Sequence, residues 1–281
     1  MAAMTRAFDI APLTAADAGA AHGLTSAVGW GHRREDWLLA LSAGHGLGAF
    51  DAGGALRGAL MWFPHGPRHA SIGMLAVDPS LHRAGIGRAL MDRTITEAGD
   101  RALLLISTEA GRRLYDTLGF RVIGSNAAHT GTAAAAGPAD GVEAAHADDL
   151  YAVTALDAAA LGYPREALMT ALATAGDIAV LRSDGRVTAF AICRRFGKGH
   201  VIGPVVGRTT DQARRLTAYW LARRVGKIVR IDVPAEHAEL AAWLVVQGLP
   251  RGGESPIMVR GDAPVPAGPE RRYALVSQAM G

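Results

Sequence analysis

The chain has 281 residues, enough for one large domain or two of ordinary size. Its composition, 49% hydrophobic and 20% charged, is typical of a soluble globular protein. The net charge is only +3, and the basic residues are scattered in pairs rather than clustered, which argues against a nucleic-acid-binding protein.

The single cysteine and the start of the chain restrict the class of protein further. Because Cys193 is the single cysteine, an intrachain disulfide and a multi-cysteine metal site are excluded. It lies in the apolar run "VTAFAICRRF", which favours a buried strand thiol over a nucleophile. The first residues lack the apolar segment of a signal peptide, and no apolar span of about 18 residues follows. We therefore expect a cytoplasmic protein with no membrane partner and no metal site.

The first part of the chain alternates helical and extended patterns. Continuous apolar runs as short as 102–107 are typical of strands that are covered on both faces. The predicted elements are, in chain order, helices over 14–28 and 33–43, a hairpin turning at 52–54, a strand over 69–78, a helix over 86–99, a strand over 102–107, a helix over 110–119 and a strand from residue 120.

A stretch of small residues with Gly and Pro, "GTAAAAGPADG" at 131–141, indicates a domain boundary. Beyond it the order recurs: "HVIGPVVG" matches "HASIGMLAVD", and helices and strands follow at similar spacing. Gly73 and Gly119 are 46 residues apart, and Gly203 and Gly248 are 45 apart. We therefore predict two copies of one α+β domain, over 1–130 and 142–281, joined by the linker 131–141.

The two copies differ where chemistry would be expected. In the first, the strand continues through Asp78-Pro79 into a loop with Gly85 and Gly87, whereas the second passes from strand to helix without a glycine pair. Tyr115 stands four residues before Gly119, but Leu244 holds the equivalent place before Gly248. This difference predicts one active domain and one degenerate partner.

Glycines between a strand and a helix often let backbone N–H groups approach a phosphate. A dinucleotide site places its glycines directly at the strand end and needs a Gly or Ala three residues after the second glycine. Here six residues separate Val77 from the turn at Ala84-Gly85, and the later position, 90, is Leu. No Gly-Lys-Ser/Thr follows, so a Walker A loop is also excluded. A glycine turn that serves packing alone stays open at this point.

The residues Val77-Asp78-Pro79, followed by His82-Arg83-Ala84-Gly85-Ile86-Gly87, resemble the signature of the GNAT N-acetyltransferase superfamily. The later "LYDTLGF" at 114–120 is similar to the C-terminal Tyr-x-x-x-Gly-Phe motif of that family. The chain also resembles the tandem-GNAT proteins, whose second domain is a degenerate copy. The resemblance implies two mixed, mostly antiparallel sheets flanked by helices. It departs from the family pattern at His82, where Gln or Arg is usual.

The resemblance implies acetyl-coenzyme A as the cosubstrate. The amides of the glycine loop and the helix N-terminus would bind its pyrophosphate, and the main chain of the strand end would pair with the pantetheine arm like an added strand. The residues expected to bind it are Leu75, Ala76, Val77, His82, Arg83, Ala84, Gly85, Ile86, Gly87 and Arg88.

Transfer to an amine by direct attack in a ternary complex needs an acid, an oxyanion donor and a base. By resemblance, Tyr115 is placed to protonate the coenzyme A sulfur, and an amide near Leu75 or Ala76 would stabilise the oxyanion. An alkylammonium has a pKa of about 10.4, so a group must take its proton. No base is evident, and a base acting through water would leave no mark. The candidates are His32, Glu35, Asp36, His65 and His69.

The acceptor is expected to be a small-molecule or peptide amine. In this family the segment between the first two helices borders it, which points here to Trp30, His32 and Trp37. A non-catalytic sensor of acyl-coenzyme A is the alternative, because no base is evident. The protein is expected to be a monomer or a homodimer.

Overall fold

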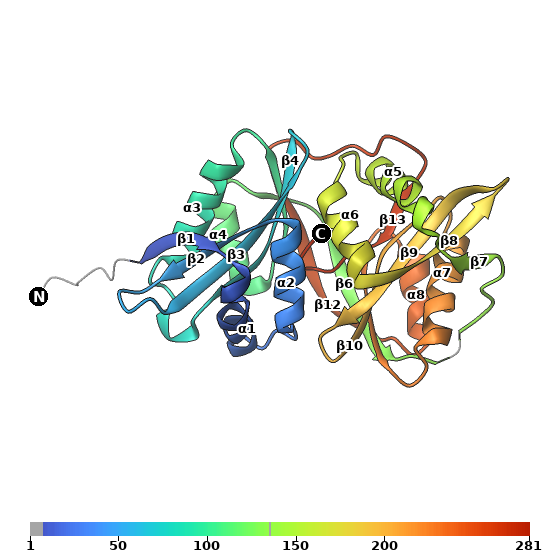
Figure 1. Cartoon of the computed structure of the whole chain (residues 1–281), viewed down its shortest axis with the longest axis horizontal. Helices are drawn as coiled ribbons and strands as arrows, with labels where there is room; N and C mark the ends of the chain where they lie inside the picture. The colour runs from blue at the N-terminus through green and yellow to red at the C-terminus, as the bar shows by residue number, and fades with distance from the viewer. Residues whose placement is uncertain (1–7, 135) are drawn as a thin grey trace, which may run out of the picture.

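The computed structural model describes residues 8–134 and 136–281, and within them thirteen strands form one mixed, mostly antiparallel sheet (Figure 1). The predicted mixed, mostly antiparallel α+β architecture is therefore confirmed, but the two separate sheets that the resemblance implied are joined into one. Residues 1–7, part of the segment on which the expectation about a signal peptide rests, lie outside the described residues. No described helix has both the length and the apolar character needed to cross a membrane.

The first half follows the predicted order and adds a first strand that was not predicted. Its elements are β1 (Asp9–Leu13), a 3-10 turn (Ala15–Asp17), α1 (Ala18–Ala27), α2 (Arg34–Ala43), β2 (His45–Phe50), β3 (Leu56–His65), β4 (His69–Val77), a 3-10 turn (Pro79–Leu81), α3 (Ile86–Ala98), β5 (Ala102–Ile106), α4 (Glu109–Thr117) and β6 (Arg121–Thr132).

The second half repeats this order. Its elements are β7 (Val142–Ala144), a 3-10 turn (Ala147–Asp149), α5 (Leu150–Leu161), α6 (Glu166–Ala175), β8 (Gly176–Ser183), β9 (Arg186–Phe196), β10 (Gly199–Gly207), α7 (Thr210–Arg223), β11 (Ile228–Pro234), α8 (Ala238–Val246), β12 (Arg251–Arg260) and β13 (Arg271–Ala274). The predicted linker, residues 131–141, overlaps the end of β6 and stops before β7; residue 135 within it is not described.

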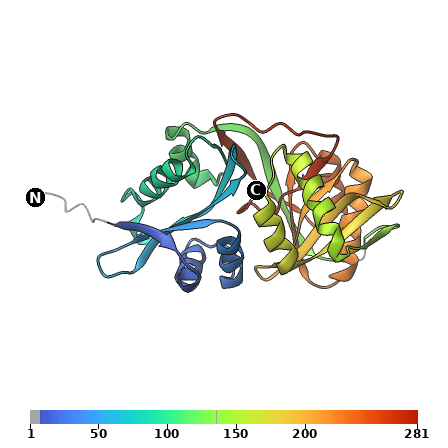
Figure 2. The same ribbon diagram turned by 45° about the horizontal axis from the view of Figure 1, so that its top comes forward.

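The two halves exchange one strand each. The strand order is β1-β2-β3-β4-β5-β12-β6-β11-β10-β9-β8-β7, with β13 paired to β10. Thus β12 of the second half pairs with β5 of the first, and β6 of the first half pairs with β11 of the second. The two exchanged strands also pair with each other, and they cross the centre of the molecule in Figure 2. Each half therefore completes the sheet of the other.

Helices cover both faces of the sheet. On one face α1, α2, α5 and α6 share a single apolar core with the chain segment after β13. On the other face α3 and α4 cover the first half and α7 and α8 cover the second, over two separate cores. The continuous core on the first face joins the two halves, since α2 packs against α6 there (Figure 1).

Candidate functional site

Strand β4 bends and then leaves its neighbour β5. The pairing of β3 with β4 shifts register between Ala59 and Met61, and Met74 at this bulge has a φ of 56°. The parallel pairing of β4 with β5 ends at Ile72, opposite Leu105. Beyond that point, the edge of β4 that carries residues 75–77 has no strand beside it among the described residues.

The second half closes the same edge with its own chain. The residues that correspond to 75–77, Val205–Gly207 on β10, pair with β13. Nearby, a Cβ on Gly203 would collide with the carbonyl oxygen of Leu275, so the chain after β13 packs tightly against the strand. An extended segment therefore fits beside this part of the strand. In the second half β13 occupies that place on β10, whereas in the first half the same place on β4 is open.

The glycine loop turns sharply before α3. Arg83 has a φ of 67° and Gly85 a φ of 84°, so two residues of the loop adopt the left-handed conformation. The amides of His82 and Ala84 pair inside the loop, with the carbonyl oxygens of Pro79 and Leu81. Within the described part of the chain, the amides of residues 83 and 85–88 have no hydrogen-bond acceptor. These five donors at a helix N-terminus suit an anion.

The space around Gly87 supports the same conclusion. A Cβ there would make only ordinary contacts of 3.6–4.0 Å with Leu114, Val77 and Leu75. Packing within the described protein therefore does not require a glycine at this position. Glycine in a helix is also less favourable than alanine, by about 1 kcal/mol. The residue leaves room for a group that approaches the helix end from outside.

The corresponding helix of the second half satisfies its own N-terminus. The Thr209 hydroxyl accepts from the amide of Gln212, at 3.2 Å. The Gln212 side chain in turn accepts from the amides of Arg208 and Thr209, at 2.7 and 3.3 Å. This capping box engages the amides of Arg208, Thr209 and Gln212 with side chains of the same chain, whereas the N-terminus of α3 has no side-chain cap.

Helix α4 brings Tyr115 to the same region. Its neighbour Leu114 lies next to Gly87, and the Arg88 guanidinium donates to the Thr117 hydroxyl at 3.2 Å. The Tyr115 ring is 8% exposed and stands edge-on to Phe120 at 6.0 Å. Burial raises the pKa of Tyr115 to about 12, so the phenol stays protonated at neutral pH. No hydrogen bond to its hydroxyl is found among the described residues.

Asp78, at the start of the loop, and Asp36, on α2, are both engaged in structural contacts. Asp78 accepts from the amide and hydroxyl of Ser80 and from Arg57, and these hydrogen bonds lower its pKa. Burial acts to raise the pKa of Asp36, but hydrogen bonds from Arg33 and the charge of Arg194 lower it more. Both carboxylates are thus stabilised in the ionised form and have little tendency to accept a proton.

The three residues expected beside the acceptor lie in different surroundings. Trp37 is fully buried in the core, and its indole N–H donates to the Thr25 hydroxyl at 3.2 Å. Trp30 is partly buried in the shared core. His32 stands edge-on to Phe196 of the second half at 5.5 Å, and burial lowers its pKa to about 4. The segment between α1 and α2 therefore contacts the second half.

The chain after β13 packs closely against β4, a contact that was not predicted. The carbonyl oxygen of Ala279 packs against Gly73, where a Cβ would collide with it. Gly73 and Gly203, the two glycines that reveal the repeat, are thus both places where this segment crosses a strand closely. The corresponding positions of these two glycines in the repeat were the only sign of this close crossing in the sequence.

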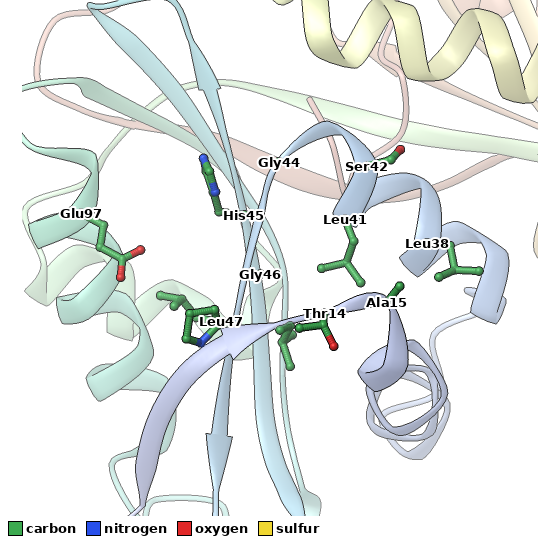
Figure 3. Close-up of a pocket in the computed structure, with 12 residues that line it drawn as sticks. Thr14, Ala15, Leu38, Leu41, Ser42, Gly44, His45, Gly46, Leu47 and Glu97 are labelled. Atoms are coloured by element: carbon green, nitrogen blue, oxygen red, sulfur yellow. The ribbon is translucent and has the colours of Figure 1, made fainter.

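Two surface pockets lie elsewhere on the first half. One, of about 340 Å³, lies between α2, β1 and β2, with His45 and Glu97 at its side (Figure 3). The other, of about 500 Å³, lies between α1 and the β2–β3 turn and reaches Asp78 and Pro79. Neither is lined by Tyr115 or by the loop 82–88. In the described residues, no group of three or more His, Cys, Asp or Glu could hold a metal ion.

Comparison with known families matches both halves separately. Residues 49–135 and residues 153–274 each match a model described as an acetyltransferase (GNAT) domain. The first match ends within the predicted linker 131–141, the second begins after it, and the exchanged strand β12 lies inside the second.

Individual relatives span nearly the whole chain. The uncharacterized N-acetyltransferase YitH of Bacillus subtilis (strain 168) is 28% identical over 266 residues, which cover 92% of this chain and 93% of the relative. A candidate acetyltransferase from Pyrococcus horikoshii has the same fold, with a TM-score of 0.80 at 19% identity over 100% of this chain and 98% of the other. A tandem GNAT protein from the clavulanic acid biosynthesis pathway has a TM-score of 0.61 at 17% identity, over 93% and 99% of the two chains.

Proposed function

Because the chain belongs to the GNAT acetyltransferases, as two such domains in tandem, we propose that its first half transfers an acetyl group from acetyl-coenzyme A to a primary amine. The amine attacks directly, with both substrates bound. The second half completes the sheet, borders the acceptor and binds no cosubstrate.

One contrast carries this proposal. In the first half the edge of β4 at 75–77 has no strand beside it, and the amides of 83 and 85–88 have no acceptor among the described residues. In the second half β13 pairs with the equivalent edge, and a capping box holds the N-terminus of α7. Unpaired donors along a strand edge and at a helix end match the extended amide arm and the pyrophosphate of coenzyme A.

The residues of the loop hold the cosubstrate by its charge. The amides of Arg83 and Gly85 to Arg88 donate to the pyrophosphate, and the positive end of α3 adds favourable electrostatics. The Arg88 side chain is engaged with Asp92 and Thr117, whereas Arg83 is exposed and free to pair with a phosphate oxygen. His82 contributes little through its own amide, which pairs with Pro79.

The reaction then uses the bulge and Tyr115. A main-chain amide at Leu75 or Ala76 stabilises the negative charge that develops on the acetyl oxygen. Tyr115 donates its phenolic proton to the departing sulfur, and its raised pKa keeps that proton in place until the thiolate forms.

The experiment that tests this function measures release of the coenzyme A thiol over a panel of polyamines, amino acids and aminoglycosides. A thiol reagent can be used directly because Cys193 is 1% exposed and burial raises its pKa to about 11. We expect at least one amine to accelerate release, with the acetyl group found on that amine by mass spectrometry. Binding of acetyl-coenzyme A without any acceleration would instead support a sensor.

A further inference from the structure

The turn 277–281, after β13, spans the place where β4 and β5 diverge. Toward β4, the carbonyl oxygen of Ala279 packs against Gly73, just before the bulge. Toward β5, the Gln278 side chain contacts β6 and β12, and β12 is the strand that pairs with β5. The turn belongs to the core that α1 and α2 share, so it lies on the opposite face of the sheet from α3 and the glycine loop.

Three strands hold Gln278 in place. Its main-chain amide donates to the Asp232 carboxylate of β11 at 3.0 Å, and this carboxylate is fully buried. Its side-chain Nε2 atom donates to Oδ1 of Asn126 on β6 at 2.9 Å and to Oγ of Ser255 on β12 at 3.3 Å. Asn126 belongs to the first half and the other two partners to the second, so both halves fix this side chain.

The direction of the Gln278 amide follows from a main-chain carbonyl group. The Nδ2 atom of Asn126 donates to the carbonyl oxygen of Ser255 at 3.1 Å. Because a carbonyl oxygen can only accept, this contact fixes Nδ2 on that side and turns Oδ1 of Asn126 toward Gln278. Gln278 must then present its donor, Nε2, to Oδ1, and this directs its own Oε1 atom away from the network.

The Oε1 atom of Gln278 is a hydrogen-bond acceptor that the protein leaves unused. No group among the described residues donates to it. The side chain is partly exposed, and Oε1 is open to solvent rather than enclosed. An amine brings N–H donors, so an oriented and accessible carbonyl oxygen is a suitable contact for it.

Two histidines near the turn are poor alternatives for meeting the amine. His65 is 2% exposed, with its Nε2 atom 2.8 Å from the Oγ atom of Ser71, and burial lowers its pKa to about 3. Burial also lowers the pKa of His69, whose ring stacks on Tyr163 of the second half at 5.1 Å. Both imidazoles therefore have little tendency to accept a proton from a substrate.

We propose that Gln278 binds the nitrogen of the attacking amine, an inference that rests on the proposed function. Oε1 accepts one N–H of the amine, on the face opposite α3, and turns the nitrogen toward the thioester at the open edge of β4. An amide oxygen takes up no proton at neutral pH, so Gln278 orients the amine and does not act as its base. Because the amide is uncharged, it also accepts from the neutral amine, which is the form that attacks.

One substitution and one matched control test this contact. Gln278→Met keeps the length of the side chain and removes Oε1, so the KM for the amine that the thiol-release panel identifies should rise about 10-fold. The Kd for acetyl-coenzyme A, measured by calorimetry, should not change. Ser255→Ala removes one partner of Nε2 and leaves Oε1 in place, so it should keep KM within about twofold.

A measurement on the bound amine distinguishes this contact from a purely structural role. The side-chain NH2 signals of Gln278 in the NMR spectrum are identified by their absence in Gln278→Met. They should shift when the same amine is added to the wild-type protein with coenzyme A bound, because a hydrogen bond to Oε1 polarises the whole amide. Signals that stay in place at saturating amine would contradict the contact.

The kinetic outcomes separate this inference from the proposed function. An equal KM for the amine in the wild-type protein and in Gln278→Met would overturn the contact and leave the acetyltransferase intact. An equal rise of KM in Ser255→Ala would also overturn it, since the network alone would then explain the loss. If no amine of the panel accelerates thiol release by the wild-type protein, the proposed function itself fails, and this inference fails with it.

Discussion

Tyr115 combines a buried ring with a hydroxyl that has no hydrogen-bond partner in the described residues. We expect Tyr115→Phe to lower kcat by about 10²-fold, because the departing thiolate would lose its proton donor. The Kd for acetyl-coenzyme A should not change, since the ring still packs on Phe120. Steady-state kinetics and calorimetry check both.

The pH dependence gives a second measurement on the same residue. Because burial raises its pKa to about 12, Tyr115 should lose its proton only well above the ordinary value of about 10. If kcat of the wild-type protein fell at a pH of about 10 and that of Tyr115→Phe did not, the buried environment assigned to Tyr115 would be contradicted.

Two substitutions at Gly87 should affect the stability of the fold and the binding of the cosubstrate differently. Gly87→Glu should abolish acetyl-coenzyme A binding, because a carboxylate would face the pyrophosphate at the helix end. Gly87→Ala should weaken binding less and raise the free energy of unfolding by about 0.5–1 kcal/mol, since its Cβ meets only ordinary contacts. Calorimetry and denaturant unfolding measure the two effects. Unchanged affinity in the glutamate variant would place the phosphate site elsewhere.

At the scale of elements, the two halves use the same strand edge differently. β13 lies along β10 where the first half leaves β4 open, and Thr209 with Gln212 closes the N-terminus of α7. The second half thus keeps the fold, while its own chain covers the strand edge and caps the helix end that the first half leaves open.

This arrangement predicts one molecule of acetyl-coenzyme A per chain. Calorimetry should give a stoichiometry of one, and Gly87→Glu should remove the whole signal. A residual second site in that variant would mean that β13 leaves its strand. Gln212→Ala serves as the control, because it changes the second helix end and should leave the stoichiometry at one.

For the whole molecule, the exchange of β6 and β12 makes the halves interdependent. A first half alone, ending in the predicted linker, would lack β12 beside β5 and expose that edge. We expect each half alone to aggregate when expressed. The two halves expressed together, divided within 137–141, should assemble into an active complex, because each keeps its exchanged strand.

Size-exclusion chromatography and thiol release on the co-expressed halves check this prediction. The intact chain should also unfold in a single cooperative transition, since one core joins α1, α2, α5 and α6 across the halves. A stable, monomeric first half on its own would contradict the interdependence.

The sequence by itself determined the local order of elements. Apolar periodicity predicted α2, α3, β4 and β5 closely, and the difference between Tyr115 and Leu244 predicts that the first copy is the active one. These features depend on residues that are adjacent in the sequence, so a short stretch of sequence is enough to predict them. β1, α5, β12 and β13 were not predicted, and β12, with Gly252, Gly253 and Pro256 among its ten residues, has a weak strand pattern.

Only the tertiary structure decided how the halves meet. The exchange of β6 and β12, the closure of the second edge by β13, and the contacts of Gln278 with Asn126 and Ser255 join residues that are brought together by folding. The burial of Trp37 in the core was decided in the same way. A sequence records which residue is polar or small, but the free energy of these contacts depends on the neighbours that the complete fold supplies.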